Sequence, residues 1–126
     1  MIKLFLVDDQ PSARRVLRQR LSLEADIRVV GEASTGEEAV ELVPTLCPDI
    51  VLMDVAMPGM DGITATTELR HVCPQSAIVI LSLYDDSATR RRAQSAGAVA
   101  FVAKDRVEEL LLCTVRQAAS DFRPPC

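Results

Sequence analysis

Five short segments of this chain are almost continuously apolar and rich in β-branched residues. They read "IKLFLV", "IRVV", "IVLM", "AIVIL" and "AVAFVA", and they begin at Ile2, Ile27, Ile50, Ala77 and Ala98. Continuous apolarity, in place of an alternation of apolar and polar residues, is typical of strands that are buried on both faces of a parallel sheet. Such a sheet requires a layer of helices on each side.

The segments between these strands have the three- and four-residue spacing of amphipathic helices. One of them shows a capping-box pattern at Ser34–Glu37 and ends before Pro48. The apolar stripes that we expect to face the sheet are Ala39, Val40, Leu42, Val43 and Leu46; Val16, Leu17 and Leu21; and Val107, Leu110, Leu111 and Val115. Strand and helix therefore alternate five times, which predicts a single α/β domain with right-handed crossovers.

The size and the charge of the chain narrow its class. Its 126 residues are enough for one well-packed domain and too few for two. The net charge of -4 argues against nonspecific binding of nucleic acid by this domain. Arginine is concentrated at Arg14, Arg15, Arg18 and Arg20, and again at Arg90–Arg92. Both groups lie in helical patterns, and each is interpreted either as a solvated helix face or as a docking face for another protein.

The sequence shows no signal for a membrane or for export. No stretch approaches the roughly 18 uncharged apolar residues that span a bilayer. Asp8 and Asp9 interrupt the apolar start where a signal peptide would continue. The four cysteines are scattered, without a C-x-x-C pair or a histidine at ligand spacing. We therefore expect a cytoplasmic protein with free thiols and no membrane partner.

Two of the apolar segments end in acids, since Asp8 and Asp9 follow the first and Asp54 follows the third. The ligand crevice of an open parallel sheet lies beyond the carboxyl ends of its strands, where the strand order reverses. If the first and third strands are neighbours there, each pair of carboxylates about 4 Å apart would repel by roughly 4 kcal/mol at an effective dielectric of about 20. Either one acid is protonated or a divalent cation binds between them. With oxygen ligands alone, Mg²⁺ fits best.

Two further polar residues stand at strand ends, Ser82 after "AIVIL" and Lys104 after "AVAFVA". A hydroxyl and an ammonium group on the same rim as an ion-bound carboxylate can hold the oxygens of a phosphoryl group, with the carboxylate as nucleophile. The turn-rich loop Val55–Gly62 also allows the backbone carbonyl of Ala56 to ligate the ion. Each signal is weak alone, and their joint placement at four strand ends is what predicts a site.

Residues 1–120 resemble the receiver domain of two-component response regulators. The segments that carry the resemblance are "VDDQPSARRVLRQRL", "GEASTGEEAVEL", "PDIVLMDVAMPGMDG", "ILS" and "AGAVAFVAKD". The "LSLYDD" segment, the "KD" ending and the "VRQAA" helix are most similar to receivers of NarL/LuxR-type transcriptional regulators. The resemblance implies an α/β, flavodoxin-like (CheY-like) three-layer sandwich, with a five-stranded parallel sheet in the order 2-1-3-4-5 and five helices. Residues 121–126 would be a tail that begins a linker to an effector domain.

The resemblance also implies a ligand set for the metal ion and a phosphoryl acceptor. Asp54 would accept a phosphoryl group from a phosphohistidine on a sensor histidine kinase. Asp8, Asp9, Asp54 and the backbone carbonyl of Ala56 would hold Mg²⁺.

The remaining implied roles concern the phosphoryl group and the conformational switch. Lys104 would pair with the phosphoryl group, and Ser82 would hydrogen-bond it. Phe101 stands at the aromatic switch position of the family. The family commonly has a tyrosine there, so a hydrogen bond from this ring to a partner is absent in this chain.

These features predict a phosphorylation-controlled binding module that is not an enzyme beyond its own phosphorylation and dephosphorylation. As part of a NarL/LuxR-type regulator it would form a homodimer and contact DNA only through an effector domain outside this chain. The alternative is a stand-alone receiver that acts through protein contacts. A Mg²⁺-dependent aspartyl-phosphate phosphatase is disfavoured, because such enzymes usually carry a second acid where Ala56 stands. A flavodoxin is disfavoured because the carboxylates of "DDQPS" would repel a flavin phosphate.

Overall fold

The computed structural model describes residues 1–121, in which five parallel strands alternate with five α-helices. The strands are β1 (Ile2–Val7), β2 (Ile27–Ala33), β3 (Ile50–Asp54), β4 (Ala77–Ser82) and β5 (Ala100–Ala103). Their order in the sheet is β2-β1-β3-β4-β5, and every neighbouring pair is parallel. The chain runs outward from β1 to β2 and then returns past β1 to β3, so the strand order reverses between β1 and β3. This confirms the predicted sheet and its order.

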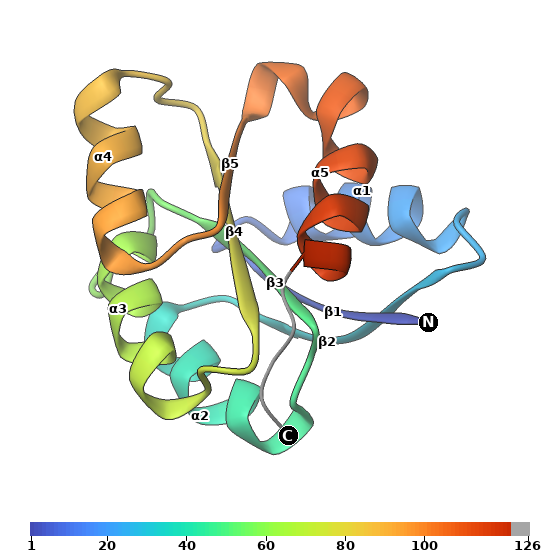
Figure 1. The fold of residues 1–126 in the computed structure, drawn as a ribbon, viewed down its shortest axis with the longest axis horizontal. Helices are drawn as coiled ribbons and strands as arrows, with labels where there is room; N and C mark the ends of the chain where they lie inside the picture. The colour runs from blue at the N-terminus through green and yellow to red at the C-terminus, as the bar shows by residue number, and fades with distance from the viewer. Residues whose placement is uncertain (122–126) are drawn as a thin grey trace.

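The helices form one layer on each side of the sheet. They are α1 (Pro11–Ser22), α2 (Gly36–Leu46), α3 (Gly62–Val72), α4 (Ser87–Ala96) and α5 (Val107–Asp121), and a 3₁₀ turn, η1 (Lys104–Arg106), precedes α5. Figure 1 shows α1 and α5 on one side of the sheet and α2, α3 and α4 on the other. The predicted three-layer sandwich is therefore confirmed.

Each layer of helices encloses its own apolar core, and the central strands contribute to both. In β3, Ile50 and Leu52 face the core under α1 and α5, whereas Val51 and Met53 face the core under α2, α3 and α4. Each of these large side chains contributes about 1.5–3 kcal/mol when it is fully buried. Because both faces of β3 are covered, the residues from Ile50 to Met53 are all apolar. The one polar residue of the strand, Asp54, is its last residue.

The two edge strands are less buried than the sequence predicted. In β2 only Ile27 and Ala33 are buried, and in β5 only Val102 and Ala103 are. An edge strand has a neighbour on one side only, so part of its backbone and side chains stays accessible. The prediction of burial on both faces is right for the central strands and wrong for the edges.

Helix α2 begins one residue later than the capping-box pattern predicted. Thr35 is the N-cap residue, and its Oγ1 accepts a hydrogen bond from the N–H of Glu38 at 3.0 Å. The carboxylate of Glu38 in turn accepts from the N–H of Ser34 at 2.9 Å. The capping bond from the N-cap side chain is thus shifted along the chain by one residue, whereas the return bond of Glu38 goes to Ser34, the residue before the N-cap, and not to Thr35 itself.

The stripe predicted for α1 is only partly right. Leu21 is fully buried and Leu17 packs against the core, but Val16 is 61% exposed. The stripe predicted for α5 is supported by Leu111 and Val115, which are both fully buried or nearly so. Val16 therefore does not pack into the core, and it lines a groove between α1 and the start of α5.

Most of the clustered arginines form ion pairs along the surface of the domain. Arg14 and Arg18 pair with Glu32, Arg20 with Glu108, Arg90 with Asp85, and Arg92 with Asp61. These pairs agree with the interpretation of solvated helix faces, except at Arg14, whose side chain is only 19% exposed.

Helix α5 reaches the segment predicted as a tail. Asp121 is the last residue of α5, so the helix continues one residue into the segment predicted as a tail. Residues 122–126, the rest of that segment, lie outside the described residues. Within residues 1–121, none of the helices combines the length and the apolar character needed to cross a bilayer.

Candidate functional site

Three carboxylates meet at the carboxyl ends of β1 and β3. Asp8 and Asp9 follow the last residue of β1, and Asp54 is the last residue of β3, which pairs directly with β1. One carboxylate oxygen from each acid lies within 4.8 Å of the other two. Asp8 and Asp54 are buried, and Asp9 is half-buried. The structure thus brings together the three acids that the sequence analysis expected to meet, at the point where the strand order reverses.

Lys104 places a positive charge among these acids. It is the first residue after β5, and its Nζ lies 3.1 Å from Asp54 Oδ1 and 3.2 Å from Asp8 Oδ2. Burial by itself would lower the pKa of Lys104, but the carboxylates of Asp54 and Asp8 outweigh it and raise the pKa above its ordinary value. Lys104 therefore remains a cation and offsets part of the repulsion within the acid cluster.

The pKa of Asp54 is raised above its ordinary value. Burial is the main cause and the negative charge of Asp8 adds to it, while Lys104 acts in the opposite direction. The raised pKa means that Lys104 compensates the ionised form of Asp54 only in part. A proton or a further cation at this carboxylate is therefore favoured. These are the two ways of relieving the repulsion between the acids that the sequence left open.

The cluster of Asp8, Asp9 and Asp54 fits a hard divalent cation. Every donor in the cluster is a carboxylate oxygen, and the oxygens converge closely enough to contact one ion. Mg²⁺ binds oxygen ligands, usually through a few carboxylates, and keeps several of its waters. Asp9 is only half-buried, so the cluster is partly accessible to solvent on its side.

The loop between β3 and α3 folds back on the end of β3. The carbonyl of Val55 accepts hydrogen bonds from the N–H groups of Met57 at 3.1 Å and Gly62 at 3.0 Å. These bonds close the loop within a few residues of Asp54. Ala56 lies inside the loop and is exposed, while Met57 is buried.

Gly62 is a residue of the site that sequence reasoning missed. It packs directly on the backbone of Asp54, so that a Cβ at position 62 would lie 2.0 Å from the carbonyl oxygen of Asp54. The sequence suggested only a turn in the Val55–Gly62 loop. Contact between two backbones leaves no side-chain pattern in a sequence, and the glycine itself was the single available signal.

Ser82 ends β4, the strand between the acid cluster and Lys104. It is fully buried and pairs in register with Ala103, while the preceding Leu81 pairs with Asp54. Its Oγ accepts a hydrogen bond from the N–H of Tyr84 at 3.0 Å. A hydroxyl can accept and donate at the same time, so Ser82 can still donate to a group bound at the rim.

Phe101 lies in β5, half-buried against the core under α2, α3 and α4. The guanidinium of Arg90 on α4 lies over its ring, with Cζ 4.5 Å from the ring centroid, and Arg90 also pairs with Asp85. A cation–π contact of this kind is worth about 0.5–1 kcal/mol at an exposed site. Sequence reasoning missed this contact, because only the packing of α4 against β5 brings the two residues together.

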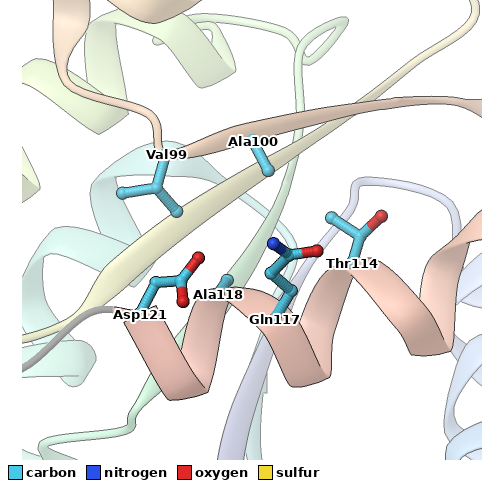
Figure 2. Close-up of a pocket in the computed structure, with 6 residues that line it drawn as sticks. All are labelled: Val99, Ala100, Thr114, Gln117, Ala118 and Asp121. Carbon is cyan, nitrogen blue, oxygen red and sulfur yellow. The ribbon is translucent and has the colours of Figure 1, made fainter.

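A separate hollow of about 320 Å³ lies between β5 and α5. Figure 2 shows Thr114, Gln117 and Asp121 on α5 facing Val99 and Ala100. Ala100 begins β5, whereas Lys104 follows its last residue. The hollow is therefore at the opposite end of the strand from the acid cluster, and it is not part of the candidate site.

The class of the protein follows from its family. The model of the response regulator receiver domain matches residues 4–116, and the chain belongs to this family. Two solved structures show the same fold. One is a LuxR-family two-component response regulator from Aurantimonas sp. SI85-9A1, with a TM-score of 0.92, 32% identity, and coverage of 98% of this chain and 88% of that chain. The other is the response regulator domain of CheB from Thermotoga maritima, with a TM-score of 0.89, 30% identity, and coverage of 99% of both chains.

Within the family, the chain resembles the NarL/LuxR-type regulators. It is 38% identical over 117 residues to the nitrate/nitrite response regulator protein NarL of Escherichia coli (strain K12), which covers 93% of this chain and 54% of that protein. It is 34% identical over 126 residues to the response regulator protein VraR of Staphylococcus aureus (strain Mu3 / ATCC 700698), which covers 98% of this chain and 60% of that protein. The chain thus spans little more than half the length of these relatives.

Proposed function

We propose that this receiver domain accepts a phosphoryl group on Asp54 from a sensor histidine kinase, in a Mg²⁺-dependent reaction, and then changes conformation to control an output. The observation that carries the proposal is the environment of Asp54. Its buried carboxylate lies 3.1 Å from the ammonium group of Lys104 and belongs to a cluster with Asp8 and Asp9. A nucleophilic carboxylate, a fixed cation and an oxygen-lined ion site are what phosphoryl transfer to an acid requires.

In the proposed transfer, an oxygen of Asp54 attacks the phosphorus of the phosphohistidine. A P–O bond forms as the N–P bond breaks, and the imidazole nitrogen keeps the electron pair. Lys104 donates a hydrogen bond to one oxygen of the phosphoryl group and Ser82 donates to another, so catalysis consists of positioning and charge compensation. The free protein is regenerated by hydrolysis, in which water attacks the phosphorus, the P–O bond to Asp54 breaks, and inorganic phosphate leaves.

The proposed Mg²⁺ ligands are the carboxylates of Asp8, Asp9 and Asp54, with the backbone carbonyl of Ala56 as a further oxygen. When bound, the ion supplies positive charge that offsets the acid cluster and the charge on the transferred oxygens. Asp8 and Asp54 then depend less on Lys104 for compensation. The ammonium group of Lys104, which lies 3.1 Å from Asp54 Oδ1 and 3.2 Å from Asp8 Oδ2, would then be available to the phosphoryl group.

The proposed switch couples Ser82 to Phe101. When the hydroxyl of Ser82 turns toward the phosphoryl group, its present hydrogen bond with Tyr84 is altered, and space opens into which the ring of Phe101 can turn. Moving the population from 1:99 to 99:1 requires a preference of about 5.5 kcal/mol for the active state. Breaking the stacking of Arg90 on Phe101 consumes only about 0.5–1 kcal/mol of that preference.

The proposed output is transcription. A structural neighbour from Staphylococcus aureus is described as a DNA-binding response regulator of the LuxR family, and the chain covers 54% of NarL. We therefore propose residues 1–120 as the receiver and residues 121–126 as the start of a linker to a DNA-binding effector domain. A histidine kinase and a second copy of the chain are the proposed partners, and the cytoplasm is the proposed location.

Intact-mass spectrometry after incubation with a small acyl phosphate tests the proposal. The wild-type protein is expected to gain the mass of one phosphoryl group when Mg²⁺ is present and not when it is chelated, because the ion offsets the charge at the acid cluster. Asp54→Asn removes the nucleophile and is expected to gain nothing.

The matched control is Asp105→Asn, which makes the same substitution at an exposed acid next to Lys104 and outside the acid cluster. It is expected to be modified as fully as the wild type. A mass increment that persists in Asp54→Asn, or that forms equally well without Mg²⁺, would refute the proposed role of Asp54 or of the ion.

A further inference from the structure

We propose that Arg14 is a positioning residue for the metal centre, which holds the backbone of Asp8 so that the acid cluster is preformed. This inference rests on the proposed function. It assigns a role to a residue outside the acid cluster that contacts neither the proposed ion nor the phosphoryl group.

Asp8 follows the last residue of β1 and is held through both its backbone and its side chain. Its N–H still donates to the carbonyl of Ala33 on β2 at 3.2 Å. Its side-chain Oδ1 accepts from the N–H of Gln10 at 2.9 Å, and its Oδ2 faces Lys104. The backbone carbonyl of Asp8 accepts from Nη1 of Arg14 at 2.6 Å. Asp8 is only 2% exposed, and a buried carbonyl without a partner costs about 1–3 kcal/mol.

The start of α1 explains why a side chain has to supply this donor. Pro11 is the first residue of the helix and has no N–H group. Gln10, the N-cap residue, makes no side-chain capping hydrogen bond. The N–H of Arg14 itself is used by the carbonyl of Gln10 at 3.1 Å. The guanidinium of Arg14 therefore supplies the donor that reaches back to Asp8.

Arg14 is itself held in place from β2. Its Nε lies 3.2 Å from Oε1 of Glu32, and both side chains are largely shielded, with 19% and 25% exposure. The planar guanidinium thus bridges Glu32 and the carbonyl of Asp8 in two directions, which the single ammonium of a lysine does less well. Glu32 is shared with Arg18, so it offsets only part of the charge of Arg14, and the contribution of geometry has to be separated from that of charge by experiment.

The geometry of Asp8 matters because Mg²⁺ tolerates little deviation from octahedral coordination. Loss of an interaction that orients a metal-binding residue typically weakens metal binding by 10–100-fold. Arg14 contacts the backbone of Asp8 and not its carboxylate, so we expect the lower end of this range, about tenfold. Weaker binding of the ion, and not a lower reactivity of Asp54, is the expected consequence.

Calorimetric titration with Mg²⁺ alone, on the unphosphorylated protein, tests the inference. Arg14→Met keeps a side chain of similar length without a donor, and its Kd for Mg²⁺ is expected to rise about tenfold. The matched control is Arg18→Met, since Arg18 pairs with the same Glu32, and among residues 1–121 no hydrogen bond joins it to Asp8. It is expected to bind Mg²⁺ like the wild type.

Phosphorylation gives a second readout that a merely structural role would not produce. Arg14→Met is expected to be phosphorylated slowly at low Mg²⁺ and at the wild-type rate once Mg²⁺ is saturating. A lower rate at saturating Mg²⁺ would overturn the positioning role. So would a Kd within about twofold of the wild type, or an equal loss of affinity in Arg18→Met.

Arg14→Lys separates geometry from charge. It keeps the positive charge and is expected to bind Mg²⁺ more weakly than the wild type, so full restoration would overturn the inference. It also carries the test if Arg14→Met does not fold. If the wild type itself neither binds Mg²⁺ nor is phosphorylated, the proposed function fails. If the wild type does both and the Arg14 variants bind Mg²⁺ as tightly as it does, only the inference about Arg14 fails.

Discussion

Replacing Gly62 by alanine is expected to disturb both the fold and the proposed reaction. The new Cβ would lie 2.0 Å from the carbonyl oxygen of Asp54 and 2.8 Å from its carbonyl carbon, whereas real Cβ atoms essentially never approach a neighbour closer than 3.0 Å. The start of α3 and the end of β3 must therefore separate by about 1 Å. Both sides of the contact are backbone, so no flexible side chain can absorb the overlap. We expect the free energy of unfolding to fall by about 3 kcal/mol, the upper end for overpacking.

The same displacement moves Asp54 relative to Lys104 and Ser82. A misplacement of about 1 Å typically costs about 100-fold in the rate of a reaction that depends on positioning. Denaturant unfolding followed by circular dichroism measures the first effect. Intact-mass kinetics with an acyl phosphate in Mg²⁺ measure the second.

Gly36→Ala is the matched control for this prediction. It adds the same methyl group at the first residue of another helix, α2, where the nearest atoms would be the Met60 carbonyl oxygen at 3.0 Å and side-chain carbons of Met60 and Ala65 at 3.1 Å. The loop and the methionine can yield there, so we expect a loss of about 1 kcal/mol and near-normal phosphorylation. If Gly62→Ala is as stable as Gly36→Ala and reacts at the wild-type rate, the steric reasoning is wrong.

Three further predictions concern charge and the switch. The pKa of Asp54 is raised in the folded protein, so the stability that this carboxyl group contributes is present below its pKa in the unfolded chain and is lost as the pH rises through its pKa in the folded protein. Asp54→Asn should therefore unfold at a higher denaturant concentration than the wild type in Mg²⁺-free buffer at neutral pH, and the difference between the two proteins should close on acidification. Hydrogen bonding to Arg116 lowers the pKa of Asp26, so Arg116→Ala should lower the free energy of unfolding near neutral pH. The difference from the wild type should vanish as the pH falls through the lowered pKa of Asp26, and a difference that does not depend on pH would contradict this. Arg90→Met removes the cation over Phe101 and should raise the population of other ring positions about two- to fivefold, seen by NMR of isotope-labelled phenylalanine, with unchanged ring signals as the contrary result.

Much of the fold could be predicted because its signals are local. The run Ile50–Met53 is apolar throughout, and in the structure both of its faces are covered. The edges were less predictable: "IRVV" from Ile27 looks like a central strand, but its place at the end of the sheet depends on the order of all five strands. Val16 was wrongly expected to pack against the core for a similar reason, since three apolar residues do not fix the orientation of a helix against the sheet.

The sequence by itself determined where strands and helices form and that acids stand at the ends of the first and third strands, because these depend on neighbours within a few residues. The tertiary structure decided which of these groups meet. It placed Nζ of Lys104 3.1 Å from Asp54, Arg14 on the carbonyl of Asp8, and Gly62 on the backbone of Asp54. Such contacts depend on strand order, crossover and side-chain conformation over the whole chain, and no local pattern encodes their distances.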